Sequence, residues 1–166
     1  MQGVRPDFIL ETGTRYRGSA LYWAMVLEEV SPAGRVITID IEDLVTDARY
    51  RALWKERIDF LVGSSTDPAI VAEVRRRVQG GRVLVILDSL HTPEHVYREL
   101  QAYSPLVDVG SYVIVQDTGL GNILAYQLAA GGVRQFLPEG SGFEVDERRE
   151  RFMITNNVRG YLRRVC

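Results

Sequence analysis

The feature that most constrains this sequence is a run of five apolar residues that ends in an aspartate. Residues 83–87 are all Val, Leu or Ile, which is typical of a strand buried on both faces of a parallel sheet. After the run stops at Asp88, Thr92 and Pro93 indicate the start of a helix, with threonine as cap and proline in the first turn. An acid at the carboxyl end of a buried parallel strand lies where open α/β sheets bind their ligands. The sequence therefore predicts a ligand-binding edge at Asp88.

A second apolar run repeats this pattern further along the chain. Residues 112–115 are apolar or aromatic, and Gln116 and Asp117 follow them. If the two strands are neighbours in a parallel sheet, their carboxyl ends meet at the same edge. We therefore expect Asp88 and Asp117 to lie close together there.

Strands and helices alternate along the whole chain, which predicts one domain over residues 1–166. Right-handed crossovers between such units produce a doubly wound, mostly parallel sheet. The expected strands are residues 8–10, 36–39, 58–62, 83–87 and 112–117, followed by a closing hairpin of residues 143–145 and 152–155. The expected helices are residues 19–30, 47–56, 68 to about 80, 93–106 and 122–137, the last interrupted at Gly131 and Gly132.

The loop after the first strand is a candidate ligand-binding loop. Gly13 and Gly18 let the main chain approach a ligand, and the next helix, for which we expect Ser19 to be the cap, offers free N–H groups. The Gly-x-x-x-x-Gly spacing matches neither the dinucleotide pattern nor the P-loop, which needs a lysine after the second glycine. Asp40, at the end of the second strand, is suited to two ribose hydroxyls. Glu11 adds a carboxylate suited to a cationic ligand.

Charge and hydropathy exclude several classes of partner. The net charge of −2 argues against a nucleic-acid-binding protein, which would normally have a basic stripe. The three arginines 75–77 are expected on the exposed end of a helix. No apolar run approaches the length of a membrane span and no signal region is present, so the expected location is the cytoplasm. The sequence leaves homo-oligomerisation open.

An acidic edge with a ribose-binding acid fits S-adenosyl-L-methionine, which has an amino group and a sulfonium but no phosphate. Five motifs together resemble the cephalosporin hydroxylase family, which is similar to class I S-adenosylmethionine-dependent, magnesium-dependent O-methyltransferases, including rhamnosyl and macrolide-sugar methyltransferases. The motifs are Glu11-Thr12-Gly13-x4-Gly18-Ser19, Ile39-Asp40, Gly63-Ser64-Ser65-x2-Pro68, Leu87-Asp88-Ser89-x-His91 and Gly110-Ser111-Tyr112-x3-Gln116-Asp117-Thr118. The resemblance implies a seven-stranded Rossmann-like sheet in the order 3-2-1-4-5-7-6, with an antiparallel strand at Phe152 between the Asp117 and Phe143 strands.

The resemblance also implies a cofactor site. Within it, Glu11 and Gly13 would face the methionine part of the cofactor, Asp40 the ribose, and Ser64 and Ser65 the adenine. The cofactor-binding residues expected in this way are Glu11, Gly13, Gly18, Ser19, Asp40, Ser64, Ser65 and Asp88.

The expected metal site follows from the same resemblance. Asp88, Gln116 and Asp117 would hold Mg²⁺, which prefers oxygen ligands. Because adjacent strand residues point to opposite faces, Gln116 and Asp117 can both reach one ion only if the strand breaks there. Asp88 and His91 are the expected catalytic residues, with His91 accepting the proton of a metal-oriented hydroxyl. The alternatives are that His91 only packs in its turn and that the aspartates only cap helices. His95 is expected on the surface.

Two departures from the family pattern leave alternative functions open. Gln116 stands where the family usually has Glu, which predicts weak Mg²⁺ binding. The family's helical segment ahead of the first strand has no counterpart, so the chain is expected to be a fragment or a minimal member. The expected acceptor is a small-molecule hydroxyl of a sugar, glycoside or polyketide-like compound. The alternatives are a catalytically weakened cofactor-binding module and a nicotinamide-dependent oxidoreductase.

Overall fold

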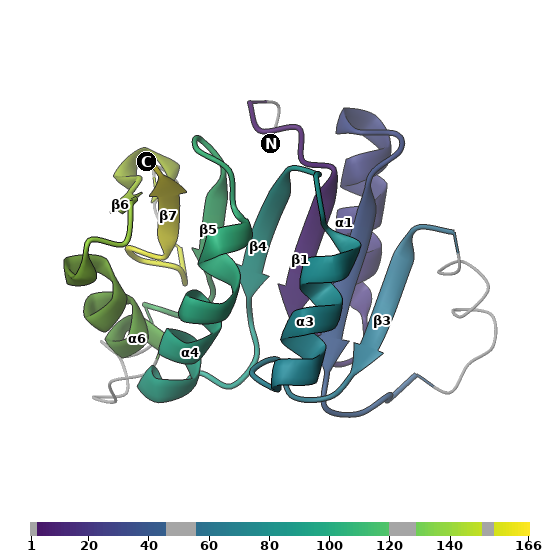
Figure 1. The fold of residues 1–166 in the computed structure, drawn as a ribbon, viewed down its shortest axis with the longest axis horizontal. Helices are drawn as coiled ribbons and strands as arrows, with labels where there is room; N and C mark the ends of the chain where they lie inside the picture. Colours follow the sequence, from purple (N-terminus) through teal and green to yellow (C-terminus); the bar gives the residue numbers. More distant parts are fainter. Residues whose placement is uncertain (1–2, 46–55, 120–128, 151–154) are drawn as a thin grey trace.

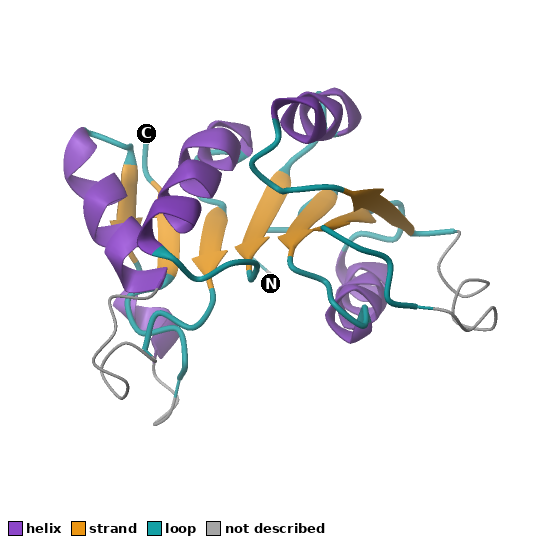
Figure 2. Cartoon of the chain, turned by 90° about the horizontal axis from the view of Figure 1, so that it is seen from below, coloured by secondary structure: helices purple, strands orange, loops and turns teal. Residues whose placement is uncertain are grey.

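A seven-stranded sheet forms the centre of the molecule, with helices packed on both of its faces (Figure 1, Figure 2). The computed structural model describes residues 3–45, 56–119, 129–150 and 155–166. The elements, in chain order, are β1 (Phe8–Thr12), α1 (Gly18–Val30), β2 (Arg35–Asp40), β3 (Ile58–Val62), α3 (Pro68–Arg77), β4 (Val83–Leu87), α4 (Pro93–Tyr103), η1 (Ser104–Leu106), β5 (Tyr112–Val115), α6 (Ala129–Phe136), η2 (Leu137–Glu139), β6 (Phe143–Val145), η3 (Glu147–Glu150) and β7 (Tyr161–Arg164).

The strand order is β3-β2-β1-β4-β5-β7-β6, which confirms the predicted order. The first five strands are parallel, and β7 runs antiparallel to both of its neighbours. The strand between β5 and β6 is β7, Tyr161–Arg164. The prediction that a strand at Phe152 lies between them is therefore wrong. Residues 152–154 lie outside the described residues, and Thr155 is not in a strand. The pairing that places β7 includes Leu162 opposite Val113.

The predicted central strand is confirmed, and so are the starts of the two helices that flank it. All five residues of β4 are buried. The Asp67 carboxylate accepts a hydrogen bond from the Ala69 N–H at 2.7 Å and caps α3. The Thr92 hydroxyl accepts one from the His95 N–H at 3.3 Å and caps α4. Among the described helices none is long and apolar enough to cross a membrane.

The described α-helices divide between the two faces of the sheet. Buried side chains of α3, α4 and α6 form one cluster, whereas those of α1 pack on the opposite face. The predicted interruption at Gly131 and Gly132 is wrong, because α6 continues through both residues. A Cβ on Gly132 would lie 2.7 Å from the main-chain oxygen of Pro93, so the glycine allows α6 to pack closely on α4. Residues 47–55 and 122–128, where further helix was expected, lie outside the described part of the chain.

The start of α1 differs from the prediction that Ser19 caps the helix. The N-cap is Arg17, which has a positive φ of 67° and makes no side-chain capping bond. Its guanidinium lies 4.0 Å from the centroid of the Phe60 ring and forms an ion pair with Asp43. The helix start is therefore fixed by contacts of Arg17 with the neighbouring strand and loop, whereas the Ser19 hydroxyl interacts with the Glu11 carboxylate.

Candidate functional site

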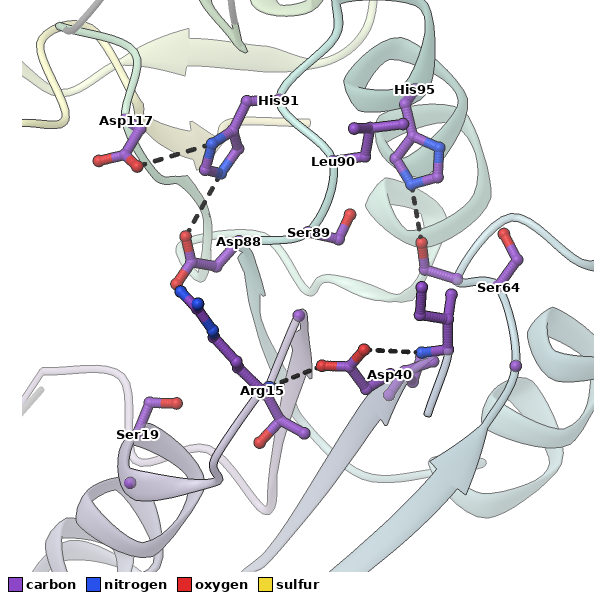
Figure 3. A pocket seen from close by; sticks show the side chains of 17 residues that line it. Arg15, Ser19, Asp40, Ser64, Asp88, Ser89, Leu90, His91, His95 and Asp117 are labelled. Carbon is purple, nitrogen blue, oxygen red and sulfur yellow. Dashed lines mark hydrogen bonds and ion pairs between the residues drawn. The ribbon is translucent and has the colours of Figure 1, made fainter. Parts of the chain in front are cut away.

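The loops that follow β1 to β5 line a cavity of about 910 Å³ (Figure 3). This is the edge of a parallel sheet at which α/β proteins bind ligands. Glu11 and Gln116 are not among the lining residues. The predicted site residues that line the cavity are Gly13, Gly18, Ser19, Asp40, Ser64, Ser65, Asp88, His91 and Asp117.

The two glycines of the first loop have different surroundings. Gly13 has a positive φ of 81°, and a Cβ there would collide with the main-chain oxygen of Asp88. A Cβ on Gly18 would meet no protein atom within 4 Å. Gly13 is therefore needed for the packing of the loop on the end of β4, whereas Gly18 gives the main chain an open side at the cavity.

Asp40 connects the glycine loop to the end of β2. Its Oδ2 accepts a hydrogen bond from the Arg15 N–H at 2.6 Å, and its Oδ1 accepts one from the Ile41 N–H at 2.7 Å (Figure 3). These two bonds fix the orientation of the carboxylate. Each carboxylate oxygen has a further lone pair, so Asp40 can still accept hydrogen bonds from a ligand.

The end of β5 brings three potential metal ligands together. The strand stops at Val115, and Asp117 has a positive φ of 55°, so the expected break in the strand is present. Ligand atoms of Asp88, His91 and Asp117 all lie within 4.8 Å of one another. The two ring nitrogens of His91 face different carboxylates: Nε2 is 3.4 Å from Asp88 Oδ1, and Nδ1 is 3.6 Å from Asp117 Oδ2 (Figure 3).

The charges around His91 control its protonation. Its pKa is raised above the ordinary value of 6.5, mainly by the hydrogen bond to Asp88 and also by the charge of Asp117, against the opposing effect of partial burial. The two carboxylates offer the oxygen ligands that suit Mg²⁺, whereas an imidazole nitrogen suits it less well. The cluster therefore fits a magnesium site with His91 beside the ion. Because Thr92 is the cap of α4, the alternative that Asp88 only caps that helix is excluded.

Glu11 is not among the residues that line the cavity. The side chain is buried and accepts hydrogen bonds from Trp23 Nε1 at 3.2 Å and from the Thr38 hydroxyl at 2.7 Å. Burial raises the pKa of Glu11, although the bond from Thr38 acts in the opposite direction. Its partners therefore lie on α1, on β2 and, through Thr14, in the loop after β1.

Gln116 is also not among the residues that line the cavity. Its N–H donates to the Leu87 carbonyl oxygen at 2.9 Å, which extends the pairing of β4 and β5 by one bond. The structure thus brings Asp88 and Asp117 together without placing the Gln116 side chain in the lining. The role of Gln116 as a third metal ligand stays a prediction.

A second polar group at the cavity was not predicted from the sequence. His95, which was expected on the surface, lines the cavity together with Ser89 (Figure 3). The His95 Nε2 atom is 3.0 Å from the Ser65 hydroxyl and 3.5 Å from Oε1 of the buried Glu99. The signal that could have revealed this group is the four-residue spacing of His95 and Glu99, which places them on one helix face.

Comparisons with known proteins identify the family. The sequence matches the model of the family "Rhamnosyl O-methyltransferase/CmcI" over residues 1–165. A rhamnosyl O-methyltransferase of Mycobacterium leprae (strain TN) is 31% identical over 167 residues, which cover 96% of this chain and 72% of that protein. One of Mycobacterium tuberculosis (strain CDC 1551 / Oshkosh) is 34% identical over 119 residues, which cover 70% of this chain and 48% of that protein. The chain thus spans about half the length of that relative.

A solved structure of CmcI with Mg and SAM has the same fold. Its TM-score is 0.70 at 18% sequence identity, and the match covers 99% of this chain and 67% of that one. The sheet order, the cavity at its edge and the match of the family model to nearly the whole sequence agree with one another. The chain therefore belongs to the rhamnosyl O-methyltransferase/CmcI family.

Proposed function

We propose that this chain is the S-adenosyl-L-methionine-binding and catalytic part of an O-methyltransferase. Its acceptor is a hydroxyl of a sugar, a glycoside or a polyketide-like natural product. The observation that carries the proposal is that one cavity combines the glycine loop, Asp40, and the cluster of Asp88, His91 and Asp117. The names of the rhamnosyl O-methyltransferase relatives and the Mg and SAM of the CmcI structure support the reaction class.

The lining residues fit the parts of S-adenosylmethionine. The open side of Gly18 and the free N–H groups at the start of α1 suit the carboxylate of the methionine part. The Asp40 carboxylate, already oriented by two main-chain N–H groups, suits the ribose hydroxyls. Ile41 and Leu90, which are exposed apolar side chains of the lining, suit the faces of the adenine ring.

Asp88, Asp117 and His91 supply the groups for the transfer step. The two aspartates would hold Mg²⁺, which when bound makes an acceptor hydroxyl lose its proton more readily. His91 lies beside both carboxylates and takes up that proton as a general base. The acceptor oxygen would then form a bond to the methyl carbon as the carbon–sulfur bond breaks, with S-adenosylhomocysteine as the leaving group.

A second candidate function is a cofactor-binding module with weakened catalysis. It is favoured by the uncharged Gln116, which is not in the cavity lining. Among the described residues, the cluster of potential metal ligands therefore has two carboxylates, Asp88 and Asp117. This candidate predicts that the chain binds the cofactor but does not transfer its methyl group.

The test combines a binding and a turnover measurement. Calorimetry with S-adenosylmethionine measures cofactor binding, and mass spectrometry measures methylated products from a panel of rhamnosides, other glycosides and macrolides, with Mg²⁺ or with EDTA. Methylation that requires Mg²⁺ is the expected result. Cofactor binding without turnover of any acceptor would favour the module, and no binding of the cofactor would reject both functions.

A further inference from the structure

A second polar cluster borders the cavity on the side of α4, apart from Asp88, His91 and Asp117. We call it the Glu99 cluster, and its members are Ser65, Ser89, His95, Glu99 and Tyr103. Three of them line the cavity, namely Ser65, Ser89 and His95. His95 lies on the same side of the cavity as Ser64 (Figure 3). The transfer step proposed above uses none of these residues.

Glu99 is the charged centre of this cluster and is fully buried. Its Oε1 accepts a hydrogen bond from the Ser89 hydroxyl at 2.6 Å and lies 3.5 Å from His95 Nε2. Among the described residues its Oε2 is buried without a hydrogen-bond partner. A buried carboxylate is costly unless donors surround it, so a proton on His95 Nε2, the nitrogen that faces Glu99, is favoured.

The same nitrogen of His95 also faces Ser65. The Nε2 atom is 3.0 Å from the Ser65 hydroxyl oxygen. When Nε2 carries its proton, it can donate that proton to the hydroxyl oxygen but cannot accept one from it. The Ser65 proton must therefore point elsewhere. Ser65 is itself buried and lines the cavity. We therefore infer that its hydroxyl proton points into the cavity.

Tyr103 holds the main chain of Ser65 from the other side. Its hydroxyl donates a hydrogen bond to the Ser65 carbonyl oxygen. Burial, together with the nearby charge of Glu99, raises the pKa of Tyr103, so the phenol stays protonated and remains a donor. The carbonyl is thus occupied, and the hydroxyl is the part of Ser65 that can interact with a ligand.

We propose that Glu99 and His95 are positioning residues that hold the Ser65 hydroxyl as a hydrogen-bond donor toward the cavity, and that this donor selects adenine over hypoxanthine. The inference rests on the proposed function, because it assumes that the cavity takes an S-adenosyl cofactor. The Watson–Crick edge of adenine has a ring nitrogen that accepts a hydrogen bond. In hypoxanthine that nitrogen carries a hydrogen, so two donors would face each other.

The experiment compares two ligands that differ only in the base. S-Adenosylhomocysteine and S-inosylhomocysteine are titrated into the wild-type protein and its variants by calorimetry, and the ratio of the two dissociation constants is the readout. The wild type is expected to prefer the adenosyl compound by about tenfold or more, because a site built around a fixed hydrogen bond rejects the analogue that cannot form it. A merely structural role of the cluster would change both affinities together and leave the ratio unchanged.

Three substitutions test the positioning role. His95→Phe and Glu99→Gln are expected to reduce the ratio to near one, because the Ser65 hydroxyl can then turn and accept. Ser65→Thr keeps a hydroxyl at the same place and is expected to retain the preference. Glu94→Gln removes a carboxylate from an exposed position of the same helix and serves as the matched control. Thermal unfolding of each variant verifies that it is folded, and either of the first two substitutions is sufficient for the test.

The outcomes separate this inference from the proposed function. If the wild type does not bind S-adenosylhomocysteine, the proposed function fails. If it binds both ligands equally well, or if folded His95→Phe or Glu99→Gln protein keeps the wild-type ratio, only the positioning role is overturned.

Discussion

Asp117 has a positive φ of 55°, and its Oδ2 lies 3.6 Å from Nδ1 of His91. The strand β5 has ended two residues earlier, at Val115, so the carboxylate is not held in the alternation of a regular strand. As a result Asp117 lies on one side of the imidazole ring and Asp88 on the other. This arrangement brings the three side chains into one cluster at the edge of the sheet.

The first prediction concerns the metal. Asp88→Asn is expected to abolish measurable Mg²⁺ binding, because the site loses one of two anionic ligands, and Mg²⁺ is held mainly by anionic oxygens. Gln116→Glu is expected to tighten binding by adding negative charge directly beside Asp117. Calorimetric titration with MgCl₂ measures both effects, and Asp108→Asn, at an exposed position, is the control. Equal affinity of the wild type and Gln116→Glu would show that residue 116 is not a ligand.

The second prediction separates proton transfer from cofactor binding. His91→Gln is expected to lower the rate of methyl transfer by about 10²- to 10⁴-fold, the usual contribution of a general base. Its affinity for S-adenosylhomocysteine should stay close to that of the wild type. Steady-state rates and calorimetry on the same preparation measure the two quantities. Unchanged turnover would mean that His91 only packs in the turn before α4.

The third prediction concerns the ribose. Asp40→Ala is expected to weaken S-adenosylmethionine binding by about 1–3 kcal/mol, because the ribose hydroxyls lose their acceptor. This corresponds to an increase of roughly five- to 140-fold in the dissociation constant. The Arg15 N–H loses its partner in the same variant, so part of the effect comes from the glycine loop. An unchanged affinity in calorimetry would show that Asp40 does not contact the cofactor.

The fourth prediction uses the two glycines as a matched pair. Gly13→Ala is expected to destabilise the protein by about 1–3 kcal/mol, the usual cost of a strained main chain, because of its positive φ and the collision with the Asp88 carbonyl. In Gly18→Ala the added Cβ meets no protein atom within 4 Å, so the stability of the protein should not fall. Its affinity for the cofactor should fall, because the Cβ occupies the open side of the main chain. Urea denaturation and calorimetry measure the two effects. The interpretation of Gly18 as the point of close approach is wrong if Gly18→Ala binds the cofactor like the wild type.

Local signals explain which parts of the fold could be predicted from the sequence. The buried run of β4 and the capping residues Asp67 and Thr92 act through their immediate neighbours, so the sequence reveals them directly. The strand β7 was missed because Arg163 and Arg164 remove the apolar pattern, and Leu162 is its only fully buried residue. What places β7 is its pairing with β5 and β6, which are distant in the sequence.

For the candidate site, the sequence predicts where residues lie along the strands but not the direction in which their side chains point. Residues at the ends of parallel strands were predicted to share one edge, and Asp40, Asp88 and Asp117 do line one cavity. The direction of a side chain depends on what packs beside it, which periodicity does not reveal. Glu11 illustrates this, because the indole of Trp23 and the hydroxyl of Thr38 hold its carboxylate between α1 and β2.

The last prediction uses this burial of Glu11. Its folded-state pKa is raised above the ordinary value of 4.5, chiefly by burial, so the folded protein binds this proton more tightly than the unfolded chain does. Stability therefore falls as the pH rises from about 4.5 through the raised pKa, and the loss is complete above it. Glu11→Gln has no charge to bury, and its amide can still accept from Trp23 and donate to Thr38. The variant is thus expected to be more stable than the wild type near neutral pH.

Chemical denaturation at a series of pH values measures this difference. The advantage of Glu11→Gln should shrink as the pH is lowered through the raised pKa toward 4.5, and below 4.5 the wild-type carboxyl becomes neutral in both states. Glu94→Gln, the same substitution at an exposed position of α4, should show no comparable dependence on pH. A wild type that is more stable than Glu11→Gln at neutral pH would mean that the hydrogen bonds from Trp23 and Thr38 outweigh the cost of burying the charge.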